Sequence, residues 1–187
     1  MTTAIVILAI IAICVISAIV MYNGLVSKKM NVSEAWSGID VQLKRKGNVI
    51  PNLVDTIKMQ TGYEGDLLEK LTKARTGITQ GSNGERLANN DAIGGLFKNV
   101  YAVAENYPQL GANESFRKMM EQVSDCEDKI TYARNRYNIS VSVYNTAVKT
   151  FPGSIFAGIF GFKEEEFFEI SQENRADFDN MRIKDID

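Results

Sequence analysis

The amino-acid sequence predicts an all-α membrane protein, with an N-terminal transmembrane helix followed by an elongated antiparallel bundle of three to four helices. Three observations lead to this fold class. Residues 4–21 form an uncharged apolar run, apolar side chains recur at helical spacing through most of the remaining chain, and no segment shows convincing strand alternation. Short links between helices of this kind favour an antiparallel bundle, and its length predicts a rod.

Residues 4–21 read AIVILAIIAICVISAIVM, and about 20 apolar residues suffice to cross the hydrocarbon core of a bilayer. Tyr22 follows at the position where an amphipathic ring favours the lipid–water boundary. We expect residues 1–26 to be a retained anchor. A cleaved signal peptide fits poorly, because no Lys or Arg precedes the run and no A-x-A-like site ends it. A lipidated Cys14 fits poorly too, because Ile13 stands where a small residue is usual.

The first bundle helix carries both a buried stripe and an unusual proline. Because the apolar phase is the same on both sides of Pro51, we expect one long helix with a kink near Gly47 and Pro51. The alternative is two helices, with Pro51 in the first turn of the second. The stripe consists of Trp36, Ile39, Leu43, Ile50, Leu53 and Ile57.

Glycine and proline mark the remaining boundaries. A short second helix follows Gly62 and Gly65, and the GSNG stretch at 81–84 separates it from a third helix that ends at Pro108. The fourth helix is expected to start near Asn113 or Ser115 and to run to the FPG at 151–153. The predicted parts are a bundle over 27–151, an aromatic membrane-proximal segment over 152–170 and a polar acidic tail over 171–187.

Composition argues against most chemistry. The 187 residues contain 21 basic and 23 acidic side chains, so no global field favours nucleic acid. The chain has no histidine, and therefore lacks the commonest general base and metal ligand. Its two cysteines, Cys14 and Cys126, form neither a CxxC pair nor a disulfide framework. We accordingly predict no catalytic residue, no metal, no cofactor and no enzymatic activity.

Polar stripes run beside the apolar ones. Each is either a solvated flank or part of a partly buried network that fixes helix register. The basic triad Lys44–Arg45–Lys46 points around much of its helix and has no interleaved aromatic rings, so it predicts a solvated or salt-bridged surface rather than a nucleic-acid site. The stripes comprise Arg45, Asn48, Asn52 and Asp55 on the first helix, and Glu127, Arg134 and Asn138 on the fourth.

The stretch FPGSIFAGIFGFKEEEFF, residues 151–168, follows the fourth helix, which should return the chain to the membrane. Its apolar run is too short to span a bilayer. The aromatic side chains either close the end of the bundle core or form an interfacial foot on lipid or between protomers. If the run is helical, Gly153, Ala157 and Gly161 share a face suited to close packing. The candidate contact residues are Phe151, Phe156, Phe160 and Phe162.

Several long stretches resemble proteins of the LemA family. They are YNGLVSKKMNVSEAWSGIDVQLKRKGNVIPNLVDTIK at 22–58, ENYPQL at 105–110, and FRKMMEQVSDCEDKITYARNRYNISVSVYNTAVKTFPGSIFAGIFGFKEEEFFE at 116–169. The resemblance implies a bacterial membrane protein with one N-terminal span, an antiparallel helical bundle, an outward-facing N-terminus and no established enzymatic activity. Residues on family-motif positions, which we interpret as structural or interaction residues, are Arg45, Asn52, Glu127, Arg134, Tyr137 and Asn138.

Two classes of function remain open. A membrane-organising scaffold or assembly module would have the lipid bilayer as one partner, and its own copies or another membrane protein as the other. The alternative is a small-molecule sensor or an accessory subunit of a membrane protease or transporter. The positive-inside rule, applied to Lys28 and Lys29, places the N-terminus outside a bacterial cell membrane and the bundle in the cytoplasm.

Overall fold

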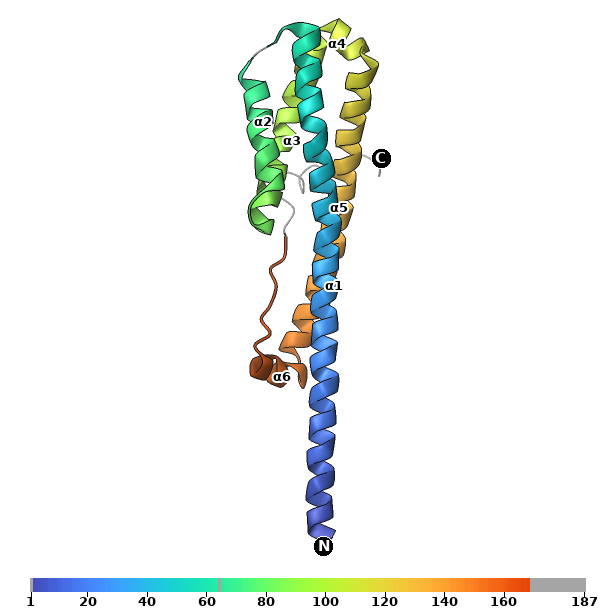
Figure 1. The fold of residues 1–187 in the computed structure, drawn as a ribbon, viewed down its shortest axis with the longest axis vertical. Coiled ribbons are helices and arrows are strands. Elements are labelled where there is room, and N and C mark those ends of the chain that lie inside the picture. The colour runs from blue at the N-terminus through green and yellow to red at the C-terminus, as the bar shows by residue number, and fades with distance from the viewer. Residues whose placement is uncertain (1, 64, 169–187) are drawn as a thin grey trace, which may run out of the picture. The chain divides into compact units, whose positions relative to one another are not determined.

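The computed structural model describes residues 2–63 and 65–168, and every regular element in these ranges is an α-helix. The predicted all-α fold class is confirmed. The predicted tail at 171–187, and the last two residues of the segment at 152–170, lie outside the described residues. The helices, in chain order in Figure 1, are α1 (Thr2–Thr61), α2 (Asp66–Thr79), α3 (Asn83–Asn106), α4 (Pro108–Ala112), α5 (Glu114–Lys149) and α6 (Gly153–Phe160).

The chain forms two compact units, and α1 and α5 each contribute to both. Unit 1 contains Met1–Gly38 and Ala133–Phe167. Unit 2 is built on Ile39–Tyr132. The anchor therefore belongs to the same unit as the end of α5 and the aromatic segment, whereas α2, α3 and α4 belong to the other.

The N-terminal part of α1 has the length and composition of a membrane span. An 18-residue window of this helix has a mean hydropathy of 3.3, and none of that window is buried by protein. Within the described residues, α1 is the one helix that meets these criteria. Apolar side chains that protein leaves uncovered over such a length are accounted for by lipid.

Beyond the span, α1 continues as a single helix through Pro51 to Thr61. The structure thus has one helix here and not two, while the expected bend at Gly47 and Pro51 stays a prediction. A side chain at position 47 would crowd α2, because a Cβ there would lie 2.8 Å from Cγ2 of Thr79, at the end of α2. Gly62, with φ of 63°, follows the last turn of α1.

Apolar side chains from all five helical segments of unit 2 form its core. The predicted stripe of α1 is confirmed here, because each of its members within this unit is completely buried. Burying one such side chain contributes about 1.5–3 kcal/mol, so the stripe alone explains why this part of α1 packs inward. The core includes Ile39, Leu43, Ile50, Leu53 and Ile57 of α1, Leu71 and Ile78 of α2, Ile93 and Val100 of α3, Leu110 of α4, and Met120, Val123 and Ile130 of α5.

Local signals explain where the helices of unit 2 begin. Gly81, with φ of 107°, separates α2 from α3, and Ser82 starts α3 with a capping box in which Ser82 and Glu85 each bind the other's backbone N–H. The Asn113 side chain accepts a 2.9 Å hydrogen bond from the Phe116 N–H, so α5 begins where the sequence predicted. The sequence did not predict α4, a short helix with Pro108 in its first turn.

Unit 1 combines the segment of α1 before residue 38 with the last turns of α5, the short helix α6 and an extended segment over residues 161–167, which we call the strap. Its buried side chains include Leu25 and Val32 of α1, Val141 and Tyr144 of α5, and Ala157 of α6. Gly161 ends α6 in the left-handed conformation, with φ of 74°. The turn to the strap therefore depends on glycine.

Candidate functional site

Three buried polar side chains of α5 hold the backbone of the strap. The Asn145 side-chain amide donates to the Glu165 carbonyl at 2.8 Å and accepts from the Glu165 N–H at 2.9 Å. The Tyr144 hydroxyl donates to the Lys163 carbonyl at 2.9 Å, and the Tyr137 hydroxyl donates to the Glu166 carbonyl at 3.2 Å. We call these contacts the clasp. They satisfy backbone groups that have no neighbouring strand or helical turn.

Burial raises the pKa of both tyrosine hydroxyls in the clasp. It raises the pKa of Tyr137, and the nearby carboxylates of Glu165 and Glu166 raise it further. Burial also raises the pKa of Tyr144, with Lys29 opposing the change. Tyrosine ordinarily titrates at about pH 10, so both hydroxyls are hydrogen-bond donors to the strap at neutral pH, and the raised pKa values extend this further into the alkaline range.

Ion pairs flank the clasp at the surface. Lys29 of α1 lies 3.3 Å from the Glu165 carboxylate, and Lys149 of α5 lies 2.7 Å from the Glu164 carboxylate. These side chains are between 34% and 63% exposed, so each pair stabilises the fold by well under about 1 kcal/mol. They place the acidic run beside α1 and α5, where the clasp holds the strap.

Aromatic rings join α6 to α1 at the end of the apolar span. The Tyr22 ring meets the Phe160 ring edge-on with centroids 5.0 Å apart, and lies 5.8 Å from the Phe162 ring. Phe156 stacks on Phe160 at 6.5 Å. Phe151 is 81% exposed. The aromatic segment thus contacts the anchor helix at Tyr22 and still leaves apolar surface uncovered.

The small-residue face of α6 packs on its own chain. Gly153 is buried, and a Cβ there would lie 2.1 Å from the Ala147 carbonyl oxygen of α5. Ala157, one turn later, is also buried. Gly161 does not extend this face, because it is exposed and forms the left-handed end of the helix. Two of the three residues expected to share a packing face therefore do so.

In unit 2 a fully buried lysine joins three helices. The Lys46 ammonium of α1 donates to Asn90 Oδ1 of α3 at 2.8 Å and forms an ion pair with Glu127 of α5. Asn90 also donates to Glu127, at 3.2 Å. The ammonium lies 5.3 Å from the centroid of the Phe97 ring, within the range of a cation–π contact. Burial lowers the pKa of Lys46, and the Glu127 carboxylate acts in the opposite direction.

The burial of Lys46 corrects the expectation that the whole basic triad forms a helix surface. Lys44 and Arg45 are exposed and salt-bridged, to Asp40 and Asp125, as that expectation requires. Lys46 has none of its surface exposed. A charge can be buried at this position because a carboxylate, an amide and a ring face surround it.

A second bridge in unit 2 is centred on Arg86 of α3. Its Nη2 lies 2.5 Å from the Asp40 carboxylate of α1, and its Nε donates to the Ile78 carbonyl of α2 at 3.0 Å. The hydrogen bond from Lys44 lowers the pKa of Asp40, burial acts against that change, and Arg86 lowers the pKa further. Asp40 is therefore ionised at neutral pH, and through Arg86 it connects α1 to α2 and α3.

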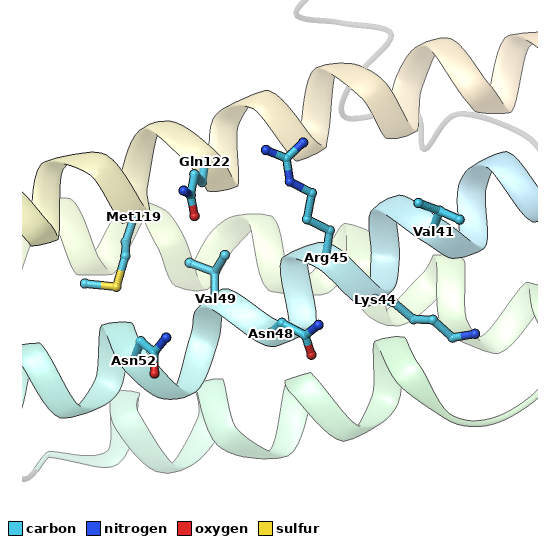
Figure 2. A pocket seen from close by; sticks show the side chains of 8 residues that line it. All are labelled: Val41, Lys44, Arg45, Asn48, Val49, Asn52, Met119 and Gln122. Carbon is cyan, nitrogen blue, oxygen red and sulfur yellow. The ribbon is translucent and has the colours of Figure 1, made fainter.

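An open groove of about 480 Å³ lies between α1 and α5 in unit 2 (Figure 2). Arg45 lies 3.1 Å from Asp125, and Lys44 lies 2.8 Å from Asp40, so both cations at the groove are already paired with carboxylates. Asn48 and Asn52 are exposed. The groove combines amides, paired cations and a few apolar groups: its lining is Val41, Lys44, Arg45, Asn48, Val49, Asn52, Met119 and Gln122.

The six family-motif residues lie in both units. Arg45 and Asn52 line the groove of unit 2, and Glu127 binds Lys46 and Asn90 there. Arg134, Tyr137 and Asn138 belong to unit 1, where Arg134 and Tyr137 are buried and Asn138 is half-buried. The Tyr137 ring also meets the Trp36 ring edge-on, at 6.3 Å. Their roles stay predictions.

Sequence reasoning missed the polar role of Tyr144 and Asn145, because Tyr144 also fits the apolar stripe of the fourth helix. A signal was present. Tyr144–Asn145 repeats Tyr137–Asn138 exactly seven residues later, which places both pairs on the same face of α5. Lys46 was missed because its neighbours in sequence are ordinary surface cations.

Comparison with known proteins decides the family. The model of the LemA family matches residues 35–180, which is most of the chain and includes parts of both units. The chain belongs to the LemA family. The expected resemblance is thereby confirmed, together with the family's helical bundle and apolar N-terminal helix.

Curated bacterial relatives extend this result. The LemA-family chain is 26% identical over 175 residues to magnetosome protein MamQ 1 of Paramagnetospirillum magneticum, covering 79% of this chain and 64% of the relative. MamQ of Magnetospirillum gryphiswaldense is 26% identical over 174 residues, with the same coverage. Protein LemA of Metamycoplasma hominis is 23% identical over 167 residues, covering 87% of this chain and 75% of the relative. The chain thus spans about two thirds of the length of the MamQ proteins.

Proposed function

We propose that this LemA-family protein is a non-enzymatic scaffold, which is anchored in the membrane by α1 and organises copies of itself or another membrane protein at the bilayer surface. One observation carries the proposal: its buried polar side chains bind other parts of the same chain. Lys46 and Arg86 each connect three helices, and Asn145 binds the strap backbone. These groups build a defined shape.

The same contacts argue against catalytic roles for these residues. A catalytic base or nucleophile must reach a substrate and change its protonation or bonding during the reaction. The Lys46 ammonium is completely buried and held by Glu127 and Asn90. Burial also raises the pKa of Cys126, which favours the unreactive thiol.

Relatives of the chain supply a second line of support. Three of them are named magnetosome proteins, and their similarity covers 79% of this chain. Lys28 and Lys29, which follow the span, support a topology with the N-terminus outside and the bundle in the cytoplasm. Modification of single cysteines on either side of the span by an impermeant reagent, in intact cells, tests that topology.

The groove in Figure 2 supports the second candidate, a small-molecule sensor or an accessory subunit of a membrane protease or transporter. Its exposed amides of Asn48 and Asn52 could orient a polar ligand. The scaffold remains the preferred proposal, because the cations at the groove are bound to Asp40 and Asp125.

Counting subunits in a bilayer tests the scaffold. The full-length chain carries one fluorophore per copy, is reconstituted at low density in supported bilayers, and is photobleached step by step beside a monomeric single-span control. A scaffold gives several bleaching steps per spot where the control gives one. Single steps at every density would contradict self-association.

Thermal unfolding with a panel of metabolites tests the sensor. A ligand present at about 100 times its Kd raises the free energy of unfolding by about 2.7 kcal/mol. Such a shift, combined with single bleaching steps, would favour the sensor over the scaffold.

A further inference from the structure

The outward side of α6 is apolar. Residues 151–162 contain no charged side chain. Gly153 and Ala157 face the protein, whereas Ile155 is 52% exposed, Ile159 is 67% exposed and the preceding Phe151 is 81% exposed. A surface helix in water normally turns polar side chains outward. Here the protein covers the small residues and leaves the large apolar ones uncovered.

The position of α6 along α1 indicates what covers this side. Residues 4–21 are 18 uncharged residues, all apolar except Ser17, and span about 27 Å of helix at 1.5 Å per residue, which is close to the thickness of a hydrocarbon core of about 30 Å. Tyr22 comes directly after them, at the level of the lipid headgroups. Because the Tyr22 ring contacts the rings of Phe160 and Phe162, the C-terminal end of α6 lies at the same level.

Charged residues follow both Tyr22 of α1 and Phe162 after α6, and they lie on the same side of the level of these rings. On α1, Lys28 and Lys29 come six and seven residues after Tyr22, about 10 Å along the helix. After Phe162 the chain becomes charged at once, with Lys163 and three glutamates. The ion pair between Lys29 and Glu165 places the charged part of the strap beside the charged part of α1. The apolar parts of both segments therefore end together.

We propose that α6 lies in the interface of the same bilayer that α1 crosses, with Phe151, Ile155 and Ile159 among the lipid chains and headgroups. In Figure 1, α6 lies beside α1 with its axis turned away from the axis of α1, as expected of a helix in the plane of the interface. Tyr22, Phe156, Phe160 and Phe162 form the aromatic belt at this boundary. The clasp holds the strap on the aqueous side. The protein thus meets the membrane twice, through a spanning helix and an interfacial one.

The covering partner of α6 is better explained as lipid than as a second copy of the chain, because α6 lies at the depth where the span of α1 ends. For a chain that lies alone in the bilayer, a side chain at that depth is surrounded by lipid on every side that its own chain does not occupy. Burial of apolar side chains there contributes about 25 cal/mol per Å² of covered surface. Of the proposed function, this inference needs only that α1 is anchored in the membrane. It does not require self-association.

Depth-dependent fluorescence quenching tests the proposal on the full-length chain. With Cys14 and Cys126 replaced by alanine, single cysteines are introduced by Ile159→Cys on α6, Ile16→Cys in the span and Ser142→Cys on the exposed side of α5, and each is labelled with an environment-sensitive dye. The chain is reconstituted at low density in phosphatidylcholine vesicles that contain lipids spin-labelled near the headgroup.

We expect the label at 159 to lose about half of its fluorescence to the spin-labelled lipids, and the label at 142 to lose less than about a tenth. Quenching at 16 without quenching at 159 would overturn the proposal while leaving the anchor intact. A label at 159 that is shielded from aqueous iodide but unquenched by lipid would show that protein covers α6, and would also overturn it. If the label at 16 is unquenched as well, both the anchor and the proposal fail.

Discussion

Arg75 of α2 donates a 3.2 Å hydrogen bond from its Nε to the Gly47 carbonyl oxygen of α1. This carbonyl is the one that would accept the N–H of residue 51 in a regular helix, and proline at 51 has no N–H to give. A side chain from the neighbouring helix therefore supplies the missing donor. Proline interrupts the hydrogen bonding of α1 beside Gly47, where a Cβ would lie 2.8 Å from Thr79 Cγ2 of α2.

The first prediction is that Pro51→Ala makes Arg75 less important. Restoring the backbone N–H gives Gly47 its helical partner, so we expect the stability of the full-length chain in mild detergent to hold or rise by up to about 1 kcal/mol. Arg75→Ala should cost about 1 kcal/mol in the natural background, and less than half of that when combined with Pro51→Ala. Urea unfolding followed by circular dichroism measures all three. Equal costs of Arg75→Ala in both backgrounds would mean that the two residues are uncoupled.

The second prediction is an asymmetry within the buried ion pair. Glu127→Gln leaves the buried Lys46 ammonium without its counter-charge, and should cost about 2–3 kcal/mol, a figure reduced because the Glu127 side chain is 33% exposed. Lys46→Met keeps the apolar stem and leaves a carboxylate that still reaches water and Asn90, so it should cost under about 1 kcal/mol. Lys98→Ala, on the exposed side of α3, is the control. A larger cost for Lys46→Met than for Glu127→Gln would refute the asymmetry.

The third prediction is that Lys46 makes the stability of the protein vary with pH in the alkaline range. Burial holds the folded-state pKa of Lys46 below its ordinary value of 10.5, so between the two pKa values the unfolded chain binds more protons than the folded one. The contribution of Lys46 to stability must therefore rise with pH up to about 10.5. We expect the free energy of unfolding of the wild type to increase relative to that of Lys46→Met as the pH is raised from about 8 to 10.5.

The raised pKa values of Tyr137 and Tyr144 act in the opposite direction above pH 10, but they are common to both chains. Parallel urea titrations at several pH values therefore isolate Lys46. A difference in free energy that stays constant over this range would show that Lys46 titrates normally.

The fourth prediction contrasts two glycines of one short helix. Gly153→Ala places a methyl group 2.1 Å from the Ala147 carbonyl oxygen, so α6 must move away from α5 at a cost of about 1–3 kcal/mol. Gly158→Ala meets nothing within 4 Å and should be neutral or slightly stabilising, because alanine favours helix. Hydrogen exchange over residues 153–167 should accelerate in the first variant alone. Acceleration in both would point to a general intolerance of α6 to alanine.

The fifth prediction concerns the clasp. Asn145→Leu keeps a buried side chain of similar size but removes both hydrogen bonds to the Glu165 backbone, so the Glu165 amide should exchange about 5–30 times faster, as expected for a loss of about 1–2 kcal/mol. Ser142→Ala, exposed on the same helix, is the matched control and should leave the exchange unchanged. An unchanged rate in Asn145→Leu would mean that other contacts protect the strap.

The sequence allowed prediction of those elements whose apolar side chains repeat with the helix. Ile50, Leu53 and Ile57 kept their phase across Pro51, and the structure continues α1 through the proline. Asn113 marked the start of α5 because its side chain caps a free backbone N–H. The strap gave no such signal. Its backbone is held by side chains 19–29 residues earlier in the chain, and the strap itself has no periodicity that indicates such contacts.

The polar contacts were harder to predict than the helices. Glu127 was singled out, but its partner on α1 is Lys46, the member of the triad that turns inward, and not Arg45. A shift of one residue changes the direction of a side chain by about 100° around a helix, so three consecutive cations cannot be ranked without the positions of α3 and α5. Position in three dimensions, rather than residue type, decides which lysine is buried.

Because α1 is one unbroken helix, the rotation of the membrane span about its axis and its depth in the bilayer are coupled. One residue inserted after Asn23 would rotate the span by about 100° and move it about 1.5 Å along the axis, and either change shifts Tyr22 relative to Phe160. Seven inserted residues would nearly restore the angle but displace Tyr22 by about 10 Å. No insertion restores both. The contact between these two rings therefore sets the azimuth of the span and its depth together, and a length change at this site alters the orientation of unit 1 in the bilayer.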